Sequence, residues 1–363
     1  MDIKIIGCGH IGAINAYCLA RMGNSISISE ISEDKLNQLC SGEALFFEKD
    51  LDWNFFYKRT TLAKKTTPYE ISLICIDAKV VEGRYQLEPL VEIVREESEN
   101  QKIVLIRTTL GGEGVHTIRE MLADCMLARE NVYYWPEFMR EGCAINDFLT
   151  DTHFIAPLFQ NGKSAPDIGV SGQIKSVDCA ITLAFVKMYS NAFRALKLTF
   201  ANTVASSTAD FKISHQLFNQ VFSELRGNCD NTYLKPGDPF GGFCLPKETD
   251  TAAKLASSNG VVGECNIFSG VNKFNEQLIE RMAIHIENSG ITEICFLGYE
   301  FKRGTSDTRN SPYLRLANCL ISKGLSVSLL DKGISGTKNI FVRDFDKINE
   351  TDFKNVYRFL DLY

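Results

Sequence analysis

The sequence predicts a protein of the α/β class, with a parallel sheet covered by helices, then a long-helix domain, then a smaller second α/β unit. Short apolar runs alternate with helical patterns over roughly the first 160 residues. A helical pattern free of Pro and Gly follows at residues 177–211, and a strand–helix–strand pattern returns from residue 294. Because such alternation is typical of parallel sheets with helices on both faces, we expect domains at 1–160, 176–275 and 276–363.

The first part of the chain has five strand candidates, at residues 3–6, 25–29, 71–76, 103–106 and 132–134. A helical pattern spans residues 13–22 between the first two, and Gly23 follows it as a C-terminal cap. The Gly-, Ser- and Pro-rich segment at 159–175 predicts a loop or a domain boundary.

The long helical pattern at 177–211 carries apolar residues at three- and four-residue spacing. A single helix of this length would suit a spine between two domains or the core of a dimer, so we expect a homodimer. Two shorter helices with an unrecognised break are the alternative interpretation.

The last part of the chain returns to α/β character. A strand is predicted at 294–298, a helix at 313–323 with Gly324 as its cap, and a strand at 326–330. The pattern fades over residues 333–363, so we expect a second, reduced nucleotide-binding unit.

Charge and composition argue against several classes of protein. The net charge of −6 disfavours broad nucleic-acid binding. No apolar run approaches the ~18 residues that would cross a membrane, and no secretory signal opens the chain. The twelve cysteines form no C-x-x-C pair and no His/Cys cluster has zinc-ligand spacing. We therefore expect a cytoplasmic protein with reduced thiols and no metal.

A G-x-G-x-x-G sequence at residues 7–12 follows the first predicted strand and opens a helix, which is the context of a Rossmann-type dinucleotide site. Gly7 permits the tight turn, Gly9 lets the backbone approach a pyrophosphate, and Gly12 allows close packing of helix and strand. His10 and Ile11 lie at the helix N-terminus, where free N–H groups favour phosphates. Glu30 ends the second strand, and its carboxylate would accept ribose hydroxyls and repel a 2′-phosphate. The motif predicts NAD, and the alternative is a glycine-rich turn that binds nothing.

Several further motifs occur in one order along the chain. They are Arg-Thr-Thr at 107–109, Pro-Glu-Phe-Met-Arg-Glu-Gly at 136–142, Lys-Met-Tyr-Ser-Asn-Ala-Phe at 187–193, Phe-Gly-Gly-Phe-Cys-Leu-Pro-Lys-Glu at 240–248, and Phe-Lys-x-x-Thr-x-Asp-x-Arg-x-Ser-Pro at 301–312. Together they resemble the motifs of the UDP-glucose/GDP-mannose dehydrogenase family over residues 1 to about 331. The resemblance implies oxidation of the C6 alcohol of a nucleotide sugar to a carboxylate, with two hydrides passed to NAD.

The implied chemistry explains the residue types. An aldehyde gives up a second hydride only as an sp³ adduct, which a cysteine thiolate supplies as a thiohemiacetal, and hydride loss then leaves a thioester. Hydrolysis of the thioester needs a general base, and a neighbouring lysine favours the thiolate. The resemblance assigns Cys244 as nucleophile, Glu137 as base for the thiohemiacetal step, and Lys187 and Asn191 as groups that hold the oxyanion, the bound water and the substrate.

The remaining roles follow from the same resemblance. Glu248 stands where the family has an Asp that helps activate the hydrolytic water. The other positions are Thr109 for water and cofactor, Glu141 for substrate, Lys247 for cofactor, and Phe240, Gly241, Lys302 and Arg309 for the sugar nucleotide. Structural alternatives stay open: Lys187 as a surface lysine, Glu137 and Glu141 as surface carboxylates on one helix face, and Arg309 as the ion-pair partner of Asp307.

This chain departs from the family at the periphery of the site. Glu248 is longer than the family's Asp, Arg107 replaces a lysine, and Trp135 replaces a small polar residue, where it would narrow the pocket or offer a stacking surface. The C-terminal unit is shorter than is usual. We expect conversion of UDP-glucose to UDP-glucuronate for a polysaccharide as the default. The alternatives are a divergent family member that oxidises another nucleotide-linked alcohol, either fully or only to the aldehyde, and a non-catalytic NAD-binding scaffold.

Overall fold

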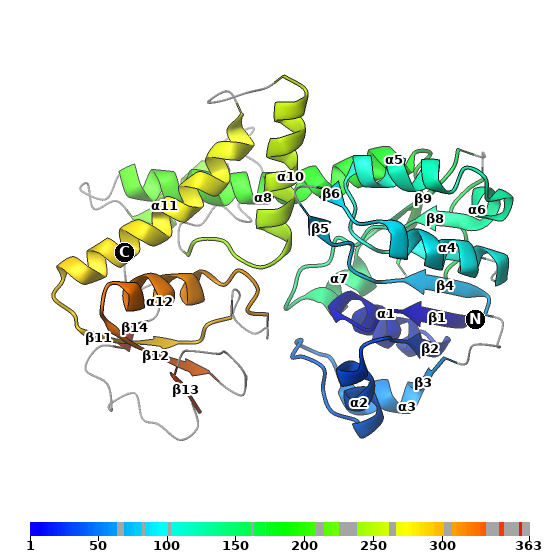
Figure 1. Ribbon diagram of the computed structural model, residues 1–363, viewed down its shortest axis with the longest axis horizontal. Helices are drawn as coiled ribbons and strands as arrows, with labels where there is room; N and C mark the ends of the chain where they lie inside the picture. The colour runs from blue at the N-terminus through cyan, green and yellow to red at the C-terminus, as the bar shows by residue number, and fades with distance from the viewer. Residues whose placement is uncertain are drawn as a thin grey trace. The chain divides into compact units, whose positions relative to one another are not determined.

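The computed structural model describes residues 1–63, 69–81, 84–100, 103–160, 163–170, 172–207, 214–224, 238–260, 266–300, 307–331, 341–344 and 356–357. The chain divides into two compact units, residues 1–188 and 189–363 (Figure 1). Each unit is described by itself below. The three-domain division drawn from the sequence stays a prediction.

The first unit is built on an eight-stranded sheet with the order β10-β9-β8-β7-β4-β1-β2-β3. All neighbouring strands are parallel except β8 and β9, which are antiparallel. The strands are β1 (Asp2–Ile6), β2 (Ser25–Ser29), β3 (Thr60–Leu62), β4 (Ile71–Ile74), β7 (Ile103–Ile106), β8 (Val132–Tyr134), β9 (His153–Pro157) and β10 (Ile174–Ser176). A small hairpin pairs β5 (Val80–Val81) with β6 (Arg84–Tyr85).

All five predicted strands are present, and the third ends at Ile74, two residues early. Residues 174 and 175, which we predicted to lie in a loop or domain boundary, form β10 together with Ser176 at the edge of the sheet. Their sequence, Ile-Lys-Ser, is too short and polar to carry an alternating apolar pattern. For the same reason, the sequence did not predict β3, which lies at the opposite edge of the sheet.

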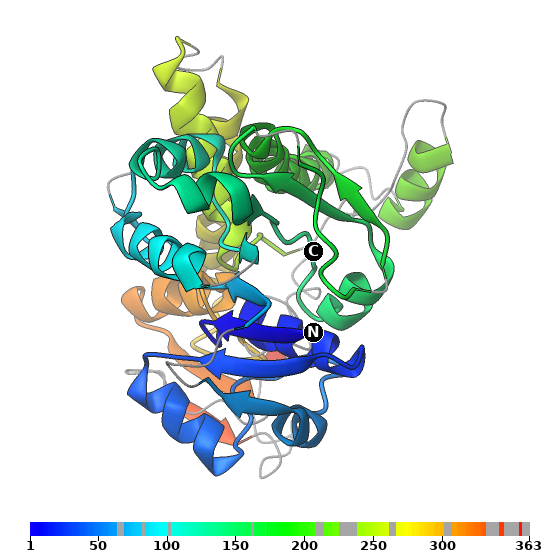
Figure 2. The same ribbon diagram turned by 90° about the vertical axis from the view of Figure 1, so that its right-hand side faces the viewer.

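Helices cover both faces of this sheet (Figures 1 and 2). They are α1 (His10–Arg21), α2 (Glu33–Ser41), α3 (Trp53–Arg59), α4 (Glu88–Asn100), α5 (Gly112–Met121), α6 (Met126–Asn131) and α7 (Ala144–Thr150). Side chains of α1, α3 and α7 pack in one core with Ile3 and Ile5, whereas those of α4, α5 and α6 pack in a second core with Val104 and Ile106. Strand residues that point to opposite faces therefore serve two separate cores, as expected for a doubly covered parallel sheet.

The long helical pattern forms one helix, α8 (Ala180–Ser207), of 28 residues. The prediction of a single helix is confirmed, although it begins three residues later than predicted. The last predicted helical residues, 208–211, lie outside the described part of the chain. The division between the two units falls within α8.

The second unit contains α9 (His215–Glu224), α10 (Cys244–Ser258), α11 (Ile267–Asn288) and α12 (Pro312–Ser322). Its parallel sheet has the order β13-β12-β11-β14, with β11 (Glu293–Leu297), β12 (Ser326–Asp331), β13 (Phe341–Asp344) and β14 (Val356–Tyr357). The predicted strands at 294–298 and 326–330 and the helix at 313–323 are confirmed within one residue. Ser311 caps α12 by accepting from the Leu314 N–H, and Pro312 begins the helix.

No helix in the described part of the chain is long and apolar enough to cross a membrane.

Candidate active site

Four predicted site residues follow the carboxyl ends of strands that are close together in the sheet. Gly7 follows β1, Glu30 follows β2, Thr109 lies after β7, and Glu137 lies after β8. These strands belong to one parallel run, in the order β8-β7-β4-β1-β2. Because parallel strands end at the same edge, these residues line the edge at which α/β sheets bind ligands.

The glycine motif is shaped for close backbone approach. Gly7 has φ +89°, and a Cβ there would lie 3.0 Å from the Cys75 carbonyl oxygen. A Cβ on Gly12 would lie 1.9 Å from the Gly7 oxygen, so no side chain fits. At Gly9, by contrast, the only described atom within 4 Å of a Cβ would be the Lys35 ammonium. Helix α1 begins at His10 with no side-chain cap, so its N–H groups and this space fit the phosphates of NAD.

Glu30 is held as an ionised acceptor beside this motif. Its carboxylate accepts from the backbone N–H groups of Cys8 at 2.8 Å, Ile31 at 2.9 Å and Ser32 at 3.0 Å. Burial alone would raise the pKa of Glu30, but these bonds and the nearby Lys35 ammonium together lower it. A carboxylate that stays charged suits ribose hydroxyls and disfavours a 2′-phosphate. Lys35, on α2, was missed from the sequence because a single lysine on a helix carries no signal of its own.

Glu137 and Lys187 form a buried ion pair. The Lys187 Nζ donates to Glu137 Oε1 at 3.1 Å, and the lysine is 2% exposed. Lys187 is therefore not a surface lysine. Burial would raise the pKa of Glu137, but Lys187 and Arg107 outweigh it and lower that pKa. Glu137 Oε2 is buried and has no hydrogen-bond partner among the described residues, which leaves one carboxylate oxygen available to a ligand.

Arg107 is a second buried cation in the same region. Its Nη1 donates to the carbonyl oxygens of Trp135 and Pro136, both at 3.2 Å. Burial lowers the pKa of Arg107 to about 10, so the group remains charged at neutral pH. The guanidinium lies 3.9 Å from the centroid of the Trp135 ring. The expectation that Trp135 offers a stacking surface to a ligand is wrong, because this ring is 1% exposed and is covered by Arg107, Phe148 and His153.

Glu141 does not share a helix face with Glu137. The backbone from Trp135 to Arg140 is irregular, and Glu141 and Gly142 form a turn in which Gly142 has φ +76°. Glu141 is half-buried there. Thr109 is half-buried as well, next to Thr108, whose hydroxyl donates to the Ile76 carbonyl at 2.8 Å.

Cys244 is the first residue of α10 and is half-buried. The loop before it is fixed by two asparagines that sequence reasoning missed. Asn275 donates to the Phe240 carbonyl and accepts from its N–H, both at 2.9 Å, and Asn310 donates to the Gly242 carbonyl at 3.0 Å. Phe240 and Gly241 are buried. A thiol at a helix N-terminus is in a setting that favours the thiolate.

Glu248 lies one turn after Cys244 on α10 and is fully buried. Residues four apart share a helix face, so its carboxylate is on the side of the helix that carries the thiol. Lys247 Nζ lies 3.0 Å from Glu248 Oε1 and 4.7 Å from the centroid of the Phe243 ring. The longer side chain that replaces the family's Asp is thus accommodated beside a lysine.

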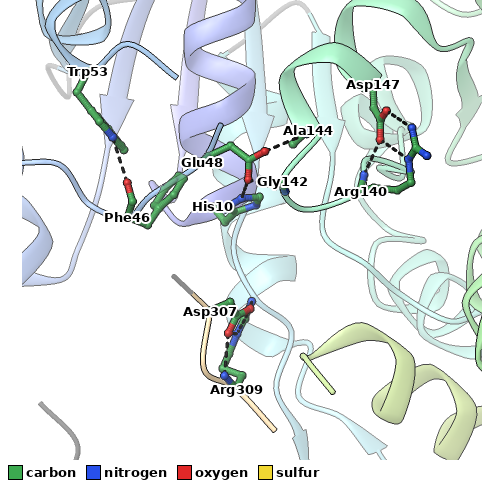
Figure 3. Close-up of polar contacts among 10 residues, drawn as sticks. All are labelled: His10, Phe46, Glu48, Trp53, Arg140, Gly142, Ala144, Asp147, Asp307 and Arg309. Atoms are coloured by element: carbon green, nitrogen blue, oxygen red, sulfur yellow. Dashed lines mark hydrogen bonds and ion pairs between the residues drawn. The ribbon is translucent and has the colours of Figure 1, made fainter. Parts of the chain in front are cut away.

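Asn191 follows Lys187 by four residues on α8, so the two lie on one face of that helix. Asn191 Oδ1 accepts from Arg194 at 3.1 Å, and its Nδ2 is buried without a hydrogen-bond partner among the described residues. Arg309 pairs with Asp307, the contact that the structural alternative predicted for these two residues, and its ligand role stays a prediction (Figure 3). Lys302 lies outside the described residues. Within the described ranges, no group of three or more His, Cys, Asp or Glu side chains is placed to hold a metal ion.

The chain is similar to known proteins over most of its length. Residues 1–156 match the NAD-binding domain of the UDP-glucose/GDP-mannose dehydrogenase family, and residues 182–277 match its central domain. A GDP-mannose 6-dehydrogenase of Pseudomonas savastanoi pv. phaseolicola is 26% identical, covering 92% of this chain and 81% of the relative. A UDP-glucose 6-dehydrogenase of Rickettsia felis is 24% identical, covering 91% of this chain and 78% of the relative.

Solved structures share the fold. A UDP-glucose dehydrogenase of Pyrobaculum islandicum superposes with a TM-score of 0.75 at 21% identity, covering 91% of this chain and 82% of that one. A UDP-D-ManNAc dehydrogenase of Pyrococcus horikoshii gives 0.76 at 20% identity, covering 98% and 93%.

These matches and the glycine motif define the class as an NAD-using nucleotide-sugar dehydrogenase. The chain belongs to the UDP-glucose/GDP-mannose dehydrogenase family, and its first unit carries that family's NAD-binding domain.

Proposed function

We propose that this protein oxidises the C6 alcohol of a nucleotide sugar to a carboxylate in two steps, with Cys244 as covalent nucleophile. The observation that carries the proposal is the buried Glu137–Lys187 pair, in which one carboxylate oxygen has no hydrogen-bond partner among the described residues. An ion pair sealed in a core would need no free acceptor, whereas a site that moves a proton on a substrate does. The cysteine at the start of α10 supports the covalent step.

The covalent chemistry requires one thiol and one base. After the alcohol has become an aldehyde, the Cys244 thiolate adds to its carbon, and the new C–S bond converts C=O to an oxyanion that takes up a proton. The Glu137 carboxylate, as the base, accepts the proton of that oxygen when the thiohemiacetal is oxidised. Loss of hydride from carbon and of the proton from oxygen then leaves a thioester. When bound at residues 7–12 and Glu30, NAD supplies the hydride acceptor for each oxidation.

The other residues stabilise charge and move water. Lys187 and Asn191 are donors for the oxyanion, in keeping with their shared helix face and with an Asn191 Nδ2 that has no partner within the described ranges. Glu248 accepts a proton from the water that attacks the thioester, and the thiolate of Cys244 leaves with the electrons of the C–S bond. Thr109 and Glu141 position water and substrate. Lys247 contacts the cofactor, and Phe240, Gly241, Lys302 and Arg309 bind the sugar nucleotide.

The identity of the substrate's nucleobase and sugar is the part of the proposal that the relatives support least. UDP-glucose is the default from the sequence motifs, yet the relatives at 26% identity act on GDP-mannose by name and those at 24% on UDP-glucose. Such a small difference in identity favours neither substrate, so both should be tested. We propose that the reaction takes place in the cytoplasm and that its uronate product serves polysaccharide synthesis.

We also propose a homodimer assembled through α8. Four large apolar side chains on this helix are exposed: Val186, Tyr189, Phe193 and Phe200. Their spacing of three, four and seven residues places them along one face, and a face of this kind is a typical subunit contact.

Trapping the acyl-enzyme tests the proposed function. Enzyme is mixed with NAD and UDP-glucose, GDP-mannose or UDP-N-acetyl-mannosamine, quenched in acid, and its intact mass measured. We expect one nucleotide sugar to add its acyl mass to the wild type and nothing to a Cys244→Ala variant. NADH formation without an adduct or an acid would favour the enzyme that stops at the aldehyde. NAD binding with no turnover of any sugar would favour the scaffold.

A further inference from the structure

One buried carboxylate in the first unit, that of Glu48, has no part in the mechanism above. It lies between α2 and α3, and its side chain is fully buried. Glu48 Oε2 lies 3.0 Å from His10 Nε2 and accepts from the Gly142 N–H at 3.0 Å, and Oε1 accepts from the Ala144 N–H at 3.1 Å (Figure 3). Both oxygens are therefore committed.

The partners of Glu48 belong to two different parts of the proposed site. His10 is the first residue of α1 and lies within the glycine motif that fits NAD. Gly142 belongs to the turn that begins at Glu141, the residue proposed to position the substrate, and Ala144 is the first residue of α7, which follows that turn. The Glu48 side chain thus joins the cofactor motif to the turn proposed to bind substrate. His10 lies 38 residues before Glu48 in the sequence, and Gly142 lies 94 residues after it.

The hydrogen bonds to the Glu48 carboxylate are charge-assisted. Burial would raise the pKa of this carboxyl, but the His10 bond and the two backbone N–H groups together lower it, so the group is ionised. Bonds from N–H groups to a buried carboxylate are stronger than neutral ones and direct their donors more firmly. A displacement of His10 would therefore move the Glu48 carboxylate, and with it the backbone N–H groups of Gly142 and Ala144.

A second buried carboxylate holds the same turn without passing through His10. Asp147 accepts from the Arg140 N–H at 2.8 Å, from Nε at 2.9 Å and from Nη2 at 2.7 Å (Figure 3). These bonds act within the segment 140–147, so Asp147 provides a matched control for a carboxylate whose role is to hold the turn.

We propose that Glu48, through its bond to His10, is a positioning residue that couples NAD binding at the glycine motif to the order of the Glu141–Gly142 turn and of the start of α7 at Ala144. The proposal rests on the proposed function in one respect, which is that Glu141 in this turn contacts the substrate. Coupling of this kind is reciprocal, so an ordered turn also strengthens NAD binding. Nucleotide sugar would then bind more tightly to the NAD complex than to the free protein.

The test measures amide hydrogen exchange at Gly142 and Ala144 with and without saturating NAD. NAD itself is titrated through tryptophan fluorescence, because Trp53 donates from Nε1 to the Phe46 carbonyl at 3.1 Å, on the segment that carries Glu48. The variants are His10→Phe, which keeps a ring beside Phe46 but removes the bond to Glu48, Glu48→Gln, and the control Asp147→Asn.

We expect NAD to slow exchange at these two amides about fivefold to tenfold in the wild type and in Asp147→Asn, and not to slow it in His10→Phe or Glu48→Gln. Glu48→Gln should also speed exchange in the absence of NAD. The proposal is overturned if both His10→Phe and Glu48→Gln keep the wild-type ratio, or if NAD slows exchange in none of the proteins. Because no sugar is used, failure of the proposed oxidation would leave this result standing.

Discussion

The guanidinium of Arg107 lies 3.9 Å from the centroid of the Trp135 ring and donates to the carbonyl oxygens of Trp135 and Pro136. Both residues depart from the family's motifs, and the structure shows that the two departures contact each other. A planar cation can stack on an indole and donate to two carbonyls at once, which a lysine ammonium cannot do in the same geometry. The pair fixes the backbone immediately before Glu137.

Replacing Arg107 by Lys should therefore destabilise the first unit while keeping the charge. We expect a loss of about 1–2 kcal/mol, from the stacking and one lost hydrogen bond. Urea unfolding followed by circular dichroism measures it. Trp135→Phe is the partner in a double-mutant cycle, and additive effects of the two changes would contradict a direct contact.

Lys187 should set the acidic limit of activity through Glu137. Lys187 and Arg107 lower the pKa of Glu137 below its usual value of about 4.3, so the base stays charged as pH falls from 8 to about 5. In Lys187→Met, the strongest group that lowers the pKa of Glu137 is removed, so burial raises that pKa. The acidic limb of the pH profile should therefore move toward neutral pH. The pH profile of kcat/KM measures this, with Lys187→Arg as the charge-retaining control. An acidic limb at the same pH in the Met variant would contradict the assignment.

His153 should make the first unit acid-sensitive. Burial first, and then Arg107, lower the pKa of this imidazole to about 4, whereas it is about 6.5 in an unfolded chain. The unfolded chain therefore takes up a proton more readily, so stability is complete above pH 6.5 and falls as pH drops toward 4. Melting temperatures between pH 7.5 and 4.5 should fall less steeply for His153→Phe, which keeps a ring against Trp135 and Phe148. An equal slope in both proteins would show that other groups control the acid transition.

Glu248 should act on hydrolysis and not on the oxidations. Glu248→Gln removes the base but keeps the size, so we expect the thioester on Cys244 to accumulate and kcat to fall about 10²–10⁴-fold. Glu248→Asp, which restores the family's residue, should retain measurable hydrolysis. Quenched-flow mass measurement separates the two steps. A Gln variant that hydrolyses its thioester at the wild-type rate would remove Glu248 from the mechanism.

The central strands and the glycine motif were predictable because each carries its signal locally. The apolar runs at 3–6 and 103–106 are buried on both faces, and residues 7–12 combine a strand, three glycines and a helix. The edge strands β3 and β10 were not predictable, since an edge position tolerates short polar sequences.

The supporting residues of the site were hidden for a different reason. Glu48 meets partners 94 and 96 residues away, and Asn275 meets Phe240 at a separation of 35. No local pattern marks a carboxylate or an amide whose purpose is to satisfy distant backbone groups. The roles proposed for Cys244, Glu137 and Lys187 came from motifs, whereas the pairing of Glu137 with Lys187 was visible only in the fold.

The most direct test of the account is the yield of NADH per nucleotide sugar, with the product identified, for the wild type and Cys244→Ala. The account predicts two NADH and one uronate per sugar for the wild type on UDP-glucose or GDP-mannose. The Ala variant should give at most one NADH and no acid. A Cys244→Ala enzyme that still forms two NADH and the acid would contradict covalent catalysis by this thiol.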